Sequence, residues 1–232
     1  MPYYGFYFDP TYLLVLIGVV LCMIASARVK TTYKKYEKVG SRSGYTADQV
    51  AYMILRNAGI TDVSIHHISG DLTDNYNPKE HTLNLSDSVY GSRSIAAIGV
   101  AAHECGHAIQ HANAYAPLTI RSAIIPAANI GSAISWPLIL IGLLIPRVDY
   151  LITLGIILFS LVLVLQFVTL PVEFNASRRA MAILEGSGYL YPDELKGARS
   201  VLTAAAMTYV AAMVSASLQL LRLVLLFGNR RR

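Results

Sequence analysis

The chain carries two histidines and a glutamate at a spacing that could bind a metal ion and activate water. His103, Glu104 and His107 form the pattern H-E-x-x-H inside an apolar run from Ser94 to Gln110. If this run is helical, the two histidines lie one turn apart on one face, and the glutamate lies beside the metal. Because buried histidines need polar partners, the apolar flanks argue against two solvated histidines. The pattern therefore predicts the hydrolytic centre of a zinc peptidase.

A catalytic zinc ion usually takes three protein ligands, so a third ligand is expected elsewhere in the chain. His111 lies two helical turns beyond His103, roughly 12 Å along the axis, which is too far to share the ion. Glu173 directly follows an apolar run that could return from across a membrane. A chain that crosses and crosses back emerges near its entry point. This hairpin geometry predicts Glu173 as the third ligand, and a solvated glutamate at a helix start is the alternative.

The composition indicates a membrane protein. The chain of 232 residues is 54% hydrophobic and 14% charged, whereas ordinary globular domains have about 25% charged residues. The net charge is +5, but the basic residues cluster at the ends of apolar runs, as in membrane proteins rather than nucleic-acid-binding surfaces. We therefore expect the lipid bilayer as a partner and no nucleic acid. The cysteines Cys22 and Cys105 do not look like a disulfide pair, and Cys105 is expected to fill space rather than bind metal.

The first apolar run covers residues 12–27 and is expected to cross the membrane. An aromatic leader, residues 1–10, extends it to the length that a bilayer needs. Lys and Arg follow the run and none precedes it, which argues against a cleaved signal peptide. By the positive-inside rule, the side that follows the run is cytoplasmic.

Two or three further apolar runs lie in the second half of the chain. The runs at 124–145 and 150–170 are expected to form a membrane hairpin, with Pro126 and Pro137 kinking the first. The run that begins at Val201 is interrupted by polar residues. It either crosses the membrane or lies in the interface, with the charged end of Arg222 reaching toward water.

The part between the first run and the hairpin has the patterns of a small α+β fold. A helix is expected over 46–59, with Thr46 as N-cap and Gly59 as stop. Alternating patterns predict strands at 63–68 and 81–86, on either side of a turn-rich loop at 71–79. The strand His81–Ser86 could be an open edge that pairs with a substrate backbone, or an ordinary core strand.

The chain is thus expected to be a mainly α, multi-pass membrane protein with three to four spans and a small α+β cytoplasmic part. The expected segments are an N-terminal span (1–27), the cytoplasmic α+β part with the metal helix (28–120), a membrane hairpin (121–170), a cytoplasmic helix with the third ligand (171–200) and a C-terminal membrane or interfacial helix (201–232).

Several stretches resemble the YugP-type neutral zinc metallopeptidases, a family of bacterial membrane proteases. The main matching stretches are Gly70–Pro78, Ala101–Gln110, Leu170–Ser177 and Leu202–Ala212. More distantly, the chain is similar to the HtpX and CAAX prenyl protease group of gluzincins, in which a membrane hairpin separates H-E-x-x-H from a glutamate in an E-x-x-A-D stretch. Ser177 stands here in place of that aspartate, which supports the site in those relatives, so either Ser177 or Asn175 could take over its role.

The resemblance implies a zincin-like site and metal-assisted hydrolysis, with Zn²⁺ held by His103, His107 and Glu173. Glu104 would act as general base and later pass its proton to the leaving amine. Tyr209 is a candidate by residue type for contacting the substrate or stabilising the oxyanion, and plain packing is its alternative. Arg178 and Arg179 are candidates of the same kind, for which a solvated or lipid-facing role is the alternative.

The expected function is that of a membrane-embedded zinc endopeptidase of the cell membrane, with its active site facing the cytoplasm. Its substrates would be proteins or peptides, including membrane-associated ones. A non-proteolytic zinc-binding scaffold or assembly factor is the alternative, although a scaffold gives Glu104 no reason to lie between the ligands. A transporter fits less well, because the apolar runs carry few ionisable residues.

Overall fold

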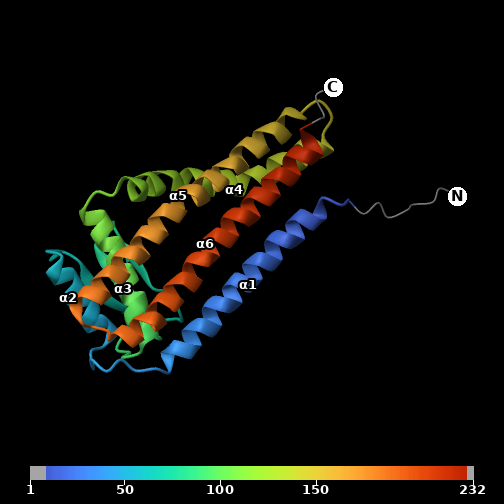
Figure 1. The fold of residues 1–232 in the computed structure, drawn as a ribbon. Coiled ribbons are helices and arrows are strands. Elements are labelled where there is room, and N and C mark those ends of the chain that lie inside the picture. The colour runs from blue at the N-terminus through green and yellow to red at the C-terminus, as the bar shows by residue number, and fades with distance from the viewer. Residues whose placement is uncertain (1–8, 229–232) are drawn as a thin grey trace. The chain divides into compact units, whose positions relative to one another are not determined.

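The computed structural model describes residues 9–228 and is mainly helical (Figure 1). Residues 1–8 of the aromatic leader and the C-terminal Asn229–Arg232 lie outside the described residues. The elements in chain order are α1 (Tyr12–Glu37), α2 (Ala47–Asn57), β1 (Ser64–Ile68), β2 (Asn75–Asn77), β3 (Thr82–Ser86), α3 (Ile95–Ala112), α4 (Ala116–Leu144), α5 (Tyr150–Ser187) and α6 (Pro192–Phe227).

The chain folds as two compact units. The sheet-containing unit consists of Ala25–Ala123 and Val168–Val210. The apolar helical unit contains the described residues up to Ile24, then Ile124–Phe167, and those from Ala211 onward. The helices α1, α4, α5 and α6 therefore contribute residues to both units.

Among the described residues, four helices are long and apolar enough to cross a membrane: α1, α4, α5 and α6. This confirms a mainly α chain with several candidate spans, and α6, which contains the run after Val201, is one of them. All four helices are longer than the apolar runs alone predict. The helix α5 continues through Pro171 to Ser187, and α6 begins at Pro192, ahead of its apolar run. Glu173 therefore lies within the helix that carries the third apolar run.

Arg222 is buried within the apolar helical unit rather than extended toward water. Its side chain lies 3.6 Å from the Asp9 carboxylate, and its guanidinium stacks 4.1 Å from the centroid of the Tyr12 ring. Only 9% of Arg222 is exposed. A buried cation is tolerated where such partners replace water, so Arg222 joins α6 to the start of α1.

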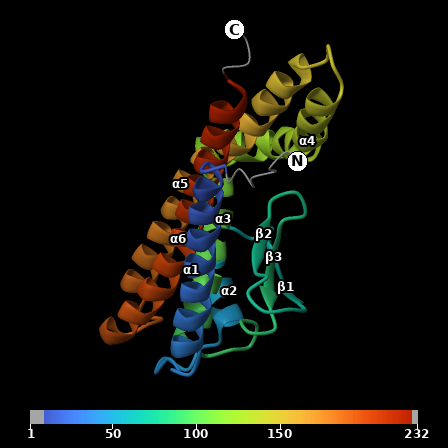
Figure 2. The same cartoon turned by 90° about the vertical axis from the view of Figure 1, so that its right-hand side faces the viewer.

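In the small sheet, the strand predicted at His81–Ser86 is central, and β1 and β2 form the edges. Its order is β1-β3-β2, with β1 parallel and β2 antiparallel to β3 (Figure 2). Of the two alternatives for His81–Ser86, the core strand is confirmed and the open edge is wrong, because β3 pairs on both sides and its Leu83 and Leu85 are fully buried. The edge strand β2 lies in the stretch predicted as a loop. Its sequence Asn-Tyr-Asn lacks the alternating apolar residues by which a strand is recognised.

One hydrophobic core joins α2, β3 and α3. Its fully buried members include Val50 and Ile54 of α2, Leu83 of β3 and Ile98 of α3. The helix α2 begins after Thr46, as predicted, and the Gln49 side chain accepts a hydrogen bond from the Thr46 backbone N–H at 3.1 Å. Burial on these faces fixes the position of α3, which carries the H-E-x-x-H pattern.

Candidate metal centre

The helix α3 holds the two motif histidines in one orientation. It begins after Ser94, whose side chain accepts a hydrogen bond from the Ala97 N–H at 3.1 Å and so caps the helix. His103 and His107 lie one turn apart, with ring centroids separated by 4.8 Å. His107 is 9% exposed. The predicted helix across the motif is confirmed.

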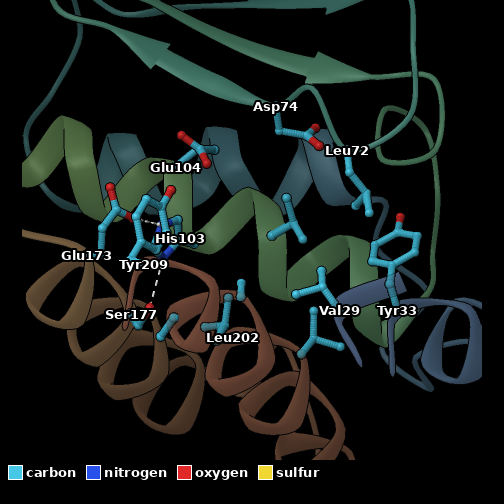
Figure 3. A pocket seen from close by; sticks show the side chains of 14 residues that line it. Val29, Tyr33, Leu72, Asp74, His103, Glu104, Glu173, Ser177, Leu202 and Tyr209 are labelled. Carbon is cyan, nitrogen blue, oxygen red and sulfur yellow. Dashed lines mark hydrogen bonds and ion pairs between the residues drawn. The ribbon is translucent and has the colours of Figure 1, made fainter. Parts of the chain in front are cut away.

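Glu173 of α5 points at both histidines. Its Oε2 atom lies 3.3 Å from His103 Nε2 and 3.6 Å from His107 Nε2, and the residue is only 2% exposed. One ligand atom of each of the three residues lies within 4.8 Å of the others. Figure 3 shows Glu173 directed toward His103, with Tyr209 beside them. The structure thus brings together the three residues that were predicted to bind metal.

Gly106 allows α5 to approach α3 closely enough for this arrangement. A Cβ atom built on Gly106 would lie 2.6 Å from the backbone oxygen of Ala176, a distance that real Cβ atoms do not show. Ala176 lies on α5 between Glu173 and Ser177. The absence of a side chain at residue 106 therefore sets the distance between the histidine helix and the glutamate helix.

Ser177 orients the first histidine. Its Oγ lies 3.1 Å from His103 Nδ1, so the ring can donate its Nδ1–H to Ser177 and keep the Nε2 lone pair free. Ser177 follows Glu173 by one helical turn, so both side chains reach the same imidazole. Of the two residues considered for the missing aspartate's role, Ser177 is the one that contacts a predicted ligand directly.

Gln110 orients the second histidine, a role that the sequence did not suggest. Gln110 Oε1 accepts a hydrogen bond from His107 Nδ1 at 3.0 Å. Its amide nitrogen donates to the Val172 carbonyl at 2.8 Å and to Asn175 Oδ1 at 3.0 Å. Arg179, which can only donate, fixes that Asn175 oxygen from the other side through Nε at 2.8 Å. These contacts determine which end of the Gln110 amide faces His107, and they leave His107 Nε2 free for a metal.

Arg121 is a second residue that the sequence did not point to. Its guanidinium lies 3.1 Å from Glu173 Oε1, while Oε2 of the same carboxylate faces the histidines. Arg121 follows the start of α4, where a basic residue ahead of an apolar run is ordinary. For that reason its type and position gave no signal. Its contact holds one carboxylate oxygen and directs the other to the metal position.

Glu104 lies beside the ligands, and Cys105 does not. Burial raises the pKa of the Glu104 carboxyl above its usual value, and the charges of His107 and His103 oppose this only in part. Burial also raises the pKa of the Cys105 thiol well above its usual value, and its Sγ–H donates to the Ala51 carbonyl at 3.6 Å. Cys105 therefore packs against α2 on the other side of the helix, as predicted for a residue that fills space.

The other residues considered for the site lie in different places in the structure. Tyr209 of α6 lines the same pocket as His103 and Glu104 (Figure 3). Arg178 lines a different groove, with Glu185 and Arg199, and Arg179 holds Asn175. His111 lies outside the group of three candidate metal ligands, and its Nδ1 lies 2.8 Å from the Tyr76 hydroxyl.

The donor set fits a catalytic zinc ion. Two imidazole nitrogens and one carboxylate oxygen form a known ligand set for such sites, which keep a fourth position for water. Each histidine has its remaining nitrogen held by another polar group, which is the usual arrangement for metal-binding histidines. The chemistry of these residues therefore suits metal-assisted hydrolysis.

Comparison with known proteins points the same way. A family model described as "Putative neutral zinc metallopeptidase" matches residues 11–228. The chain is 45% identical over 207 residues to the "Putative membrane protease YugP" of Bacillus subtilis (strain 168), a match that covers 89% of this chain and 92% of that protein. No solved structure is significantly similar to the chain. The name of the relative and the four apolar helices together indicate a multi-pass membrane protein.

Proposed function

The chain belongs to the family of neutral zinc metallopeptidases, and on this premise we propose that it is a membrane-embedded zinc endopeptidase. The observation that carries the proposal is the convergence of His103, His107 and Glu173, with Glu104 in the same pocket. A purely structural zinc site has four protein ligands. Here three candidate ligands converge, and a buried glutamate that is not one of them lies beside them. This favours a peptidase over a zinc-binding scaffold.

Different residues of the site have different roles in hydrolysis. A zinc ion bound there would supply a Lewis acid that polarises a carbonyl and acidifies a water molecule. Glu104 takes the proton of the attacking water and passes it to the leaving amine. Tyr209 lines the same pocket as His103 and Glu104, and in this proposal its hydroxyl stabilises the negative charge that develops on the carbonyl oxygen. Ser177 and Gln110 keep the two imidazoles in the ligand tautomer.

The edge strand β2 supplies a place for the substrate backbone. It pairs with β3 on one side only among the described strands, and it packs against α3. Asp74, which directly precedes β2, lines the pocket with His103 and Glu104. An extended peptide that pairs with β2 would therefore lead toward the metal position. Only an unfolded or flexible substrate segment can become extended and pair with β2 in this way.

The proposed site faces the cytoplasm at the membrane surface. The basic residues that flank the apolar runs belong largely to the sheet-containing unit, for example Arg28, Lys34, Arg178 and Arg199. Such residues are typical of the cytoplasmic side of membrane proteins. The substrates would then be cytoplasmic or membrane-associated proteins and peptides.

The test compares Glu104→Gln and Glu173→Ala with the parent in zinc content and in cleavage of an unfolded protein substrate. Glu104→Gln should keep its zinc and lose cleavage by at least ~100-fold, because the general base is removed while the ligands stay. Glu173→Ala should lose most of its zinc as well. Glu80→Gln, an exposed glutamate outside the pocket, is the matched control and should behave like the parent.

Two outcomes would reject the proposal. Cleavage by Glu104→Gln at the parent's rate would remove Glu104 from the mechanism. A parent protein that binds one zinc ion and cleaves no protein or peptide substrate would favour the scaffold instead.

A further inference from the structure

The pocket at the metal centre extends well beyond the residues that the chemistry uses. It has a volume of about 170 Å³ and runs along α3, away from Glu173 and toward α1 (Figure 3). Its metal end is polar. The other end is lined by apolar side chains from α1, the loop before β2 and α6, namely Val29, Tyr33, Leu72, Leu202, Ala205 and Ala206. The described residues thus form an apolar chamber that opens directly onto the metal position.

The wall opposite α6 is held in place by specific contacts. Leu72 has a left-handed backbone, with φ of 55°, which a side-chain-bearing residue rarely adopts. Its N–H lies 3.4 Å from Ser88 Oγ, and its side chain lines the chamber. The Tyr33 hydroxyl donates to the Ser88 carbonyl at 2.8 Å, so the polar end of Tyr33 is satisfied. Backbone strain of this kind persists where surrounding contacts hold a residue at a functional position.

The chamber offers little to a charged or polar guest. Asp74 is the acidic residue nearest to Leu72 in the lining, and each of its oxygens already accepts a hydrogen bond. Oδ1 accepts from the Ser86 N–H at 2.8 Å, and Oδ2 accepts from the Ser86 hydroxyl at 2.9 Å. A charged side chain among the aliphatic residues of the chamber would lose its hydration and gain at most one partner, Asp74, whereas an apolar one would be favoured.

Two small residues set the depth of the chamber. Ala205 and Ala206 lie on α6 one turn before Tyr209, and both line the pocket. Each contributes a single methyl group where a larger residue would fill the space. A protein cavity of roughly 150 Å³ holds a benzene-sized guest. The whole pocket, metal end included, has a volume of about 170 Å³, so its apolar end has room for one side chain.

We propose that this chamber is a specificity subsite that binds a large apolar, leucine-sized side chain of the residue adjoining the scissile bond. Ala205 and Ala206 determine the size of the side chain that fits. The inference rests on the proposed peptidase function and adds a substrate class to it: extended peptides with a bulky aliphatic residue at the cleavage point.

The experiment uses the full-length, zinc-loaded protein in detergent and a set of otherwise identical internally quenched peptides. The residue on either side of the expected cleavage point is Gly, Ala, Leu, Phe, Lys or Asp, and mass spectrometry locates the cut. The parent should cleave the leucine peptide at least ~10-fold faster in kcat/KM than the alanine peptide, because one methylene in an apolar pocket is worth roughly 10- to 200-fold. The lysine and aspartate peptides should be the poorest.

Variants of the chamber separate size selection from general damage. Ala205→Leu and Ala206→Leu should reduce cleavage of the leucine peptide far more than that of the alanine peptide, so that the preference reverses. Leu202→Ala enlarges the chamber and should shift the preference toward phenylalanine. Ala182→Leu, the same substitution at an exposed alanine of α5, should keep the parent's preference.

The possible failures are distinguishable. If the parent cleaves peptides without preference for an apolar residue, or if the filled and enlarged variants change all peptides by the same factor, the subsite is overturned and the peptidase function stands. If the zinc-loaded parent cleaves no peptide of any kind, the proposed function falls and the subsite with it.

Discussion

The two imidazoles at the metal centre depend on side chains that need not touch the metal. His103 is oriented by Ser177, and His107 is oriented by Gln110. Gln110 is fully buried, and its amide is held by Val172 and Asn175. Because a neutral imidazole has one donor and one acceptor, fixing Nδ1 as the donor makes Nε2 the acceptor that a metal requires.

Replacing Gln110 by leucine should therefore weaken zinc binding although no ligand is changed. The substitution keeps the volume but leaves the His107 Nδ1–H without its partner, and losses of this kind typically cost 10- to 100-fold in metal affinity. Competition with a chromogenic chelator measures the affinity. Gln219→Leu, the same change on α6 in the apolar helical unit, is the control. An affinity for Gln110→Leu within twofold of the parent would contradict the role given to Gln110.

The elements show what sequence patterns can and cannot predict. The metal helix, α2 with its Thr46 cap, and the strands β1 and β3 follow from local periodicity and end signals, which act over a few residues. The position of Glu173 follows from the hairpin, a constraint on the chain path. The strand β2 was missed because its pairing comes from β3 and not from its own composition. Arg121 was missed because its partner Glu173 lies on α5, far along the chain, and Gln110 because the groups that orient its amide lie there too.

The close packing of α3 on α5 should make Gly106 intolerant of even one methyl group. In Gly106→Ala the new Cβ would meet the Ala176 carbonyl oxygen, so the two helices must separate, with an overpacking cost of about 1–3 kcal/mol. Because that separation moves Glu173 away from the histidines, zinc stoichiometry should fall together with the thermal midpoint.

The matched control for this prediction is Gly99→Ala on the same helix. A Cβ there would lie 3.4 Å from the Ala198 side chain, which is an ordinary contact. Alanine also favours the helical backbone by up to about 1 kcal/mol over glycine, so Gly99→Ala should keep its zinc and its stability. Equal zinc content in the two variants would mean that the approach at Gly106 does not control the site.

Charge distribution sets the expected orientation of the whole molecule in the membrane. The sheet-containing unit carries the basic stretch after the first apolar run and the arginines around Arg178. The link between α4 and α5 has only two charged residues, Arg147 and Asp149. Because moving many lysines and arginines across a membrane is disfavoured, the sheet-containing unit should stay in the cytoplasm, and the link should lie outside.

Labelling of single cysteines with a membrane-impermeant maleimide tests this orientation. Lys79→Cys lies in an exposed turn between β2 and β3, and Asp149→Cys lies in the exposed link between α4 and α5. Both are made in a Cys22→Ala background, and the fully buried Cys105 should stay unreactive. On intact cells the reagent should label Asp149→Cys and not Lys79→Cys, and after permeabilisation it should label both. Labelling of Lys79→Cys on intact cells would contradict this orientation and would place the metal centre and its substrates outside the cytoplasm.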